Sequence, residues 1–167
     1  MLKQTKPAFL VAIGLSLVLI GSRFAHASPN PLEGVWKVVE VTTTGPKGTK
    51  QAAPQPGFYL FTGKHYSIVT VNADKARPDL PQDTNTATLE QLQATWGQFT
   101  CQSGTYEVKG SEVTFHALAA KNPSAMKAGN FSTSSFKIEG STLTLVNKAN
   151  QAGPATNPTT RKLTRVE

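Results

Sequence analysis

Eight short segments of this chain alternate apolar with polar residues, and turn-forming residues separate them. Alternation with a period of two is typical of a strand that buries one face. The predicted strands cover residues 35–43, 58–61, 65–71, 104–108, 112–118, 131–138, 141–146 and 159–166. Eight antiparallel strands with mostly short connections can close into an up-and-down barrel around one small ligand, which also removes exposed edges. We therefore predict an all-β, eight-stranded antiparallel barrel, and a two-sheet sandwich is the alternative.

One helix is predicted between the third and fourth strands. Within residues 86–98, Leu89, Leu92, Gln93 and Trp96 recur at helical spacing and form an amphipathic stripe. The candidate N-cap residues are Thr84, Asn85 and Thr86. We expect this helix to lie against the barrel or across one end of it.

The first 27 residues have the features of a signal peptide. Lys3 and Lys6 form a basic start, residues 8–21 are apolar, and Ala25-His26-Ala27 is a cleavage signal. The apolar run is shorter than the roughly 18 to 20 residues that span a bilayer. We expect cleavage after Ala27, which leaves residues 28–167 as one exported domain in the periplasm or outside the cell. An uncleaved anchor is the alternative.

Charge and cysteine content exclude several partners and cross-links. The whole chain carries +7 at pH 7, and the mature part carries +4 once Lys3, Lys6 and Arg23 are removed. These charges are scattered, without the basic run of a nucleic-acid footprint, so we expect no nucleic-acid binding and no stable membrane insertion after cleavage. Cys101 is the only cysteine, so no disulfide forms within the chain. We expect a monomer.

The first and last predicted strands carry a tryptophan and an arginine that can be compared with a known pattern. Gly34-Val35-Trp36 opens the first strand and Arg165 lies in the last one. With eight strands, this resembles the calycin pattern of lipocalins and their relatives. The resemblance implies that Trp36 packs at the closed end and that a basic side chain of the last strand lies over its ring, a cation–π contact. Arg165 is the first candidate, and Arg161, on the same strand face, is the second.

Seven short motifs are spread over nearly all of the mature region, and they are Leu32-x-Gly34-x-Trp36, Pro56-Gly57-x-Tyr59-Leu60, Ser103-Gly104-x-Tyr106-Glu107-Val108, Val113-x-Phe115-His116, Asn122-Pro123, Gly140-x-x-Leu143-x-Leu145 and Arg165. In their order and spacing, the chain is similar to the bacterial lipocalin-like domain family. It differs from typical secreted lipocalins because it has no disulfide and its predicted helix lies in the middle.

Catalytic and metal-binding motifs are scarce in the sequence. The mature region has only two histidines, His65 and His116, and neither lies in an H-x-H or H-E-x-x-H arrangement. There is no G-x-S-x-G elbow, P-loop or G-x-G-x-x-G fingerprint. We therefore predict no catalytic residues, no metal and no cofactor.

Five side chains are candidates for contact with a ligand. His116 points into the barrel if Phe115 packs outward, and it lies on the outer face if Phe115 packs inward. Tyrosines combine a ring with a hydroxyl, as pockets often need, and the helix can carry a tryptophan over the barrel mouth. Ordinary core packing is the alternative for these four aromatic residues, which are Tyr59, Tyr66, Tyr106 and Trp96.

The sequence thus favours an exported, non-catalytic lipocalin-like barrel that binds a small apolar or amphipathic molecule in its interior. Two alternatives are open. The first is a barrel enzyme, an isomerase or hydrolase of a lipid-like substrate, that uses His116 and a tyrosine. The second is a structural or interaction protein whose barrel is filled with side chains. A fold by itself does not separate these functions.

Overall fold

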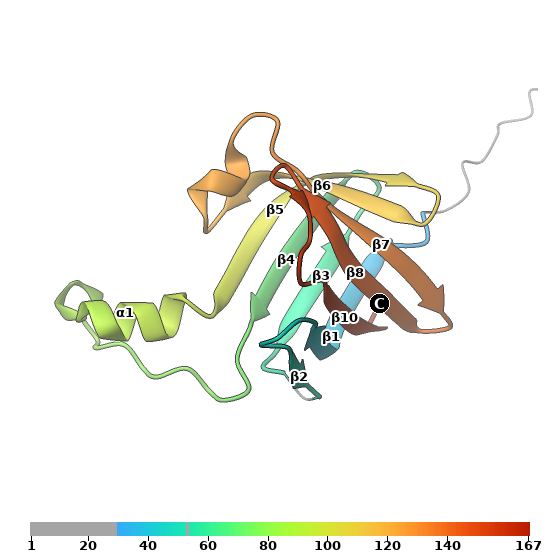
Figure 1. Cartoon of the computed structure of the whole chain (residues 1–167). Helices are drawn as coiled ribbons and strands as arrows, with labels where there is room; N and C mark the ends of the chain where they lie inside the picture. The colour runs from blue at the N-terminus through green and yellow to red at the C-terminus, as the bar shows by residue number, and fades with distance from the viewer. Residues whose placement is uncertain (1–29, 53) are drawn as a thin grey trace, which may run out of the picture.

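The computed structural model describes residues 30–52 and 54–167, and it is a closed antiparallel β-barrel (Figure 1). Each barrel strand pairs with the next barrel strand along the chain. The last barrel strand pairs with the one before it and also with the first, which closes the barrel. The barrel strands are β1 (Gly34–Thr43), β3 (Gly57–Phe61), β4 (His65–Val71), β5 (Phe99–Lys109), β6 (Glu112–Ala120), β7 (Ser132–Glu139), β8 (Thr142–Asn150) and β10 (Thr159–Arg165).

This topology confirms the eight-stranded up-and-down barrel, and the sandwich alternative is wrong because the sheet closes on itself. Two short strands lie outside the barrel path: β2 (Thr49–Gln51) pairs with β1, and β9 (Gly153–Pro154) pairs with β8. A short 3₁₀ helix, Pro123–Met126, follows β6. The predicted signal peptide lies outside the described residues.

The predicted helix is present but shorter than expected. It is α1 (Leu89–Trp96), and its N-cap is Thr88, which forms a capping box with Gln91. The three expected N-cap residues instead form a 3₁₀ turn, Thr84–Thr86, that Asp83 caps. Among the described residues, no helix is long and apolar enough to cross a membrane.

The position of α1 corrects the sequence prediction. We expected the helix to pack on the barrel, but none of its residues is buried, and Figure 1 shows it standing away from the barrel. Leu89 is 70% exposed and Trp96 is 48% exposed. The segment that carries α1 runs from the end of β4 to the start of β5, so it forms an arm beside one end of the barrel.

A β-bulge in β1 changes which side chains face inward. The pairing with β10 shifts between Val38 and Glu40, so Val39 is an extra residue. Trp36 and Val38 belong to the core and Val41 packs against it, whereas Glu40 points outward. Without the bulge, alternation would place Glu40 on the same face as Trp36 and Val38.

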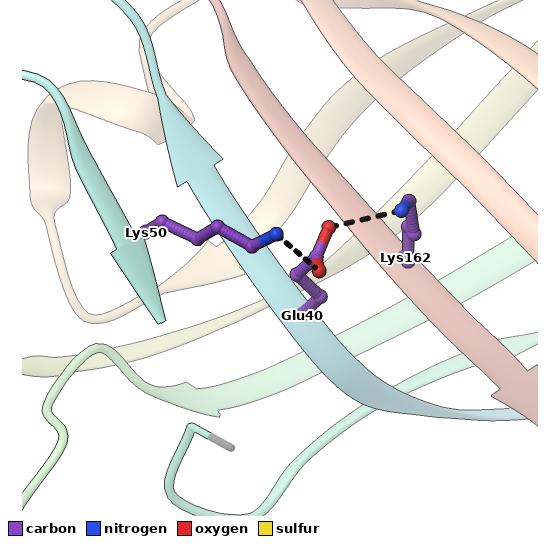
Figure 2. Close-up of polar contacts among 3 residues, drawn as sticks. All are labelled: Glu40, Lys50 and Lys162. Carbon is purple, nitrogen blue, oxygen red and sulfur yellow. Dashed lines mark ion pairs between the residues drawn. The ribbon is translucent and has the colours of Figure 1, made fainter. Parts of the chain in front are cut away.

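The outward carboxylate of Glu40 joins three strands. It lies 3.3 Å from Lys50 of β2 and 3.0 Å from Lys162 of β10 (Figure 2). These two lysines lower the pKa of Glu40 from its ordinary value of 4.5, mainly by hydrogen bonding to the carboxylate.

The core fills one end of the barrel. Its fully buried side chains there are apolar, and aromatic rings pack edge to face among them, with 5.2 Å between the ring centroids of Phe61 and Tyr106. The segment of residues 30–33 covers this end, because Leu32 is fully buried and Asn30 donates to the Tyr106 hydroxyl. We call it the closed end. The fully buried side chains are Trp36, Leu32, Leu143, Leu163 and Val113.

Candidate functional site

The opposite, open end of the barrel contains a cavity of about 260 Å³. It lies between the last residues of β4 and β8 and the first residues of β5, β7 and β10, so strands far apart in the sequence contribute to its wall. The lining side chains are Tyr59, Ile68, Thr70, Thr100, Gln102, Phe115, Ser132, Ser134, Leu145, Asn147, Thr159 and Arg161.

The polarity of the lining changes with depth. Residues two apart on a strand share a face. On β4, Ile68 lies deeper than Thr70, and on β8, Leu145 lies deeper than Asn147. The rim is therefore polar and the floor is apolar. This arrangement suits an amphipathic molecule whose apolar part enters first.

Arg161 is the only charged residue in the lining. On β10 it lies between Thr159 at the rim and the buried Leu163, and it pairs with Val41 of β1 and Leu145 of β8. Among residues 30–52 and 54–167, no carboxylate lies within ion-pair distance of its guanidinium. The cavity thus has a fixed positive charge near its mouth.

Of the five predicted ligand contacts, Tyr59 lines this cavity. Tyr66 is buried among core rings instead, 4.8 Å from Phe115 between ring centroids. Burial raises the pKa of Tyr66 to about 12, and within the described chain its hydroxyl has no hydrogen-bond partner.

Tyr106 lies at the closed end, away from the cavity. Its hydroxyl donates to the Thr62 carbonyl at 2.6 Å and accepts from the Asn30 side chain at 2.5 Å. Burial is the main cause that raises its pKa. Tyr106 therefore attaches the covering segment to the barrel and is not part of the cavity wall.

His116 lies on the outer face of β6. Phe115 packs inward into the core, so the side chain of the next residue points to the opposite face. Of the two orientations open at the sequence level, the structure therefore has the outward one. The barrel-enzyme hypothesis required His116 and a tyrosine together inside the cavity, and the structure does not bring them together there.

Trp96 does not cover the mouth. It lies at the end of α1, where its ring meets Phe99 edge to face with 5.9 Å between centroids. The Lys121 ammonium donates to the Trp96 carbonyl and, at 2.9 Å, to the Phe99 carbonyl. Trp96 thus belongs to the base of the arm.

The three residues expected to have a structural role meet at the closed end. The Arg165 guanidinium carbon lies 4.1 Å from the centroid of the Trp36 ring, which is the contact that the resemblance implied. Arg165 also donates to the carbonyls of Glu33 at 2.6 Å and Pro31 at 3.0 Å. Gly34 has φ +124°, and a Cβ there would overlap the Glu167 carbonyl oxygen, so only glycine fits.

A second hollow, of about 500 Å³, lies beside the arm between the β2–β3 loop, the β4–α1 loop and α1. It is formed by loop residues such as Arg77 and Leu80 and is not enclosed by the barrel. Among the described residues, no group of three His, Cys, Asp or Glu side chains is arranged to hold a metal ion.

Most of the cavity lining is neither aromatic nor histidine, so the sequence did not single it out. The rim is made of Thr, Ser, Asn and Gln, which are common everywhere on strands. Arg161 had a detectable signal: it shares a strand face with Arg165, so an inward Arg165 implies an inward Arg161.

Two comparisons with known proteins gave matches. The family model of the lipocalin-like domain matches residues 33–164. A solved structure of a lipocalin-like protein from Bacteroides uniformis is 18% identical, and the alignment covers 80% of this chain and 97% of that chain with a TM-score of 0.42. No curated protein matches the chain.

Proposed function

Because the chain belongs to the lipocalin-like domain family, we propose that it is an exported, non-catalytic protein that binds one small amphipathic molecule. The observation that carries this proposal is the cavity of about 260 Å³ at the open end, with its apolar floor and polar rim. Burial of the apolar part of the ligand drives binding, and the polar rim orients the rest. The filled-barrel function is the alternative, and the fully buried side chains of the closed end are the observation that favours it.

The first test is native mass spectrometry of the protein purified from its own host, followed by identification of whatever is bound. We expect one co-purifying small molecule. A thermal-shift screen with fatty acids, alcohols and small aromatic acids extends the test. An empty protein that no compound stabilises would contradict the proposal and favour the filled-barrel function.

A matched pair of variants places the site. Ser134 lines the cavity, and its neighbour Ser135 points to the opposite face of β7. Ser134→Leu fills part of the cavity and should abolish co-purification, whereas Ser135→Leu should leave it unchanged. Denaturant unfolding of both variants checks that the barrel is intact.

Export and oligomeric state have separate tests. The leader of residues 1–27 supports export, and we expect N-terminal sequencing of the protein from periplasm or medium to begin at Ser28. The closed barrel leaves no unpaired barrel edge, which favours a monomer in light scattering. A protein that keeps residues 1–27 in the membrane fraction would favour the uncleaved anchor.

A further inference from the structure

The two arginines of β10 that share a strand face have different surroundings. Arg165 at the closed end lies over Trp36 and donates to the carbonyls of Glu33 and Pro31, so the fold uses its guanidinium. Arg161 at the open end lines the cavity, and among the described residues it forms no ion pair. The fold therefore leaves the charge of Arg161 available for another group.

The surroundings of Arg161 are suited to an anion. The cavity lining contains no Asp or Glu, and hydroxyl and amide side chains such as Thr159 and Asn147 lie beside it at the rim. A guanidinium presents a planar fork of donors that matches a carboxylate with two parallel hydrogen bonds. A charged group enclosed on several sides by protein also attracts an anion more strongly than one in open water.

Depth and size limit the rest of the ligand. Arg161 pairs directly with Leu145 of β8, one inward position below Thr159 at the rim, so its backbone lies level with the apolar floor of Ile68, Leu145 and Phe115. The cavity volume of about 260 Å³ is the volume that roughly nine water molecules occupy in liquid water. An acid of this size has room for a short alkyl chain or one aromatic ring.

We infer that the ligand is a small monocarboxylate, with its carboxylate on Arg161 and its apolar part on the floor of the cavity. The inference rests on the binding function proposed above and specifies its ligand class. It assigns to Arg161 direct contact with the ligand, and to Arg165 a structural role only.

The test compares two probes of equal chain length on the purified protein stripped of bound ligand. Octanoate carries the carboxylate and octanol does not, so calorimetric titration of both isolates the contribution of the charge. We expect octanoate to bind about tenfold or more tightly than octanol. This comparison uses the natural sequence and does not depend on whether a variant folds.

Two variants then locate the charge. Arg161→Gln should weaken octanoate about tenfold or more and leave octanol unchanged. Lys148→Gln removes the same charge from an exposed position one residue beyond Asn147 on β8, and octanoate should bind it as it binds the unchanged protein.

The outcomes separate this inference from the proposed function. If octanol binds as tightly as octanoate, or if Arg161→Gln and Lys148→Gln weaken octanoate equally, the carboxylate assignment is wrong while the binding function stands. If neither probe binds and the native mass spectrum is empty, the binding function itself fails.

Discussion

The closed and open ends of the barrel use the same strands and differ in what fills them. At the closed end, Trp36, Leu143 and Leu163 are fully buried, and the covering segment adds Leu32. At the open end, the inward positions of the same strands carry Thr159 and other polar residues around a cavity. The buried apolar packing is therefore concentrated at one end, and the cavity of the proposed binding site lies at the other.

The last strand shows this division most directly. Along one face of β10, Arg161 lines the cavity, Leu163 is fully buried, and Arg165 covers the Trp36 ring. Three successive inward positions thus lie in the cavity wall, in the core and over the ring at the closed end. Substitutions at the two ends should have separable effects, and four predictions test this.

The largest expected effect is the loss of Trp36. Trp36→Ala removes a fully buried ring and the hydrogen bond that its indole N–H donates to the Leu32 carbonyl at 2.7 Å. We expect the free energy of unfolding to fall by about 3 to 5 kcal/mol, measured by denaturant titration. Thr100→Ala at the cavity rim is the control and should cost far less. Equal losses would contradict a stability difference between the ends.

The two arginines of β10 give a sharper comparison. Arg165→Gln loses the contact with Trp36 and the hydrogen bonds to two carbonyls, so we expect a loss of roughly 1.5 to 3 kcal/mol in the free energy of unfolding. Arg161→Gln should change it by about 0.5 kcal/mol or less, because no ion pair is broken. A larger loss for Arg161 would show that its side chain also serves the fold.

Tyr66 tests how tightly the core excludes polar groups. Its buried hydroxyl lacks a partner within the described chain, so Tyr66→Phe should raise the free energy of unfolding by about 1 kcal/mol at neutral pH. The pKa of Tyr66 is raised from 10.0 to about 12, so the folded state disfavours the phenolate. The stability that depends on this group is complete below pH 10 and is lost as the pH rises to about 12.

Unfolding of both proteins between pH 9 and pH 12 measures this effect, with the pH range set by that shift. The advantage of the Tyr66→Phe variant should grow as the pH rises above 10. An advantage that stays constant with pH would mean that the tyrosine ionises as easily in the folded chain as in the unfolded one.

The smallest effect is expected on the outer surface, at Glu40. The lysines that hydrogen-bond to it lower its pKa, so its contribution to stability is present above pH 4.5 and is lost as the pH falls through the lowered value. Glu40→Gln should lower the melting temperature slightly at pH 7, and the difference should vanish in acid. A difference that persists in acid would indicate that Glu40 stabilises the bulge by packing rather than by charge.

Sequence reasoning succeeded where local chemistry decides the outcome. The predicted strands on either side of residues 110 and 140 form two hairpins, and Gly110 and Gly140 have φ of +60° and +59° in their turns. Helical spacing located α1, but it placed the N-cap wrongly, because Thr88 with Gln91 forms a capping box that competes successfully with the upstream residues. Its exposed stripe also shows that an amphipathic pattern does not guarantee a packing partner.

The cavity was predicted poorly because its residues depend on strand register. Bulges in β1, β6 and β8 shift the pairing and interrupt the simple alternation of faces. His116 was a candidate only if Phe115 faced outward, and packing of Phe115 with Tyr66 decides otherwise. No local sequence pattern indicates which of the two faces of a strand will point into the barrel.

The sequence by itself determined the number and order of the barrel strands, because the two-residue period and the turn residues are local signals. The contact of Trp36 with Arg165 joins the two ends of the domain, and it was expected only from the resemblance to the calycin pattern. The tertiary structure decided that Glu40 and His116 face outward and that Arg161 stands in a cavity. The physical reason is that inward and outward faces are set by bulges and by the register at which the last strand closes the barrel, and both are global properties of the sheet.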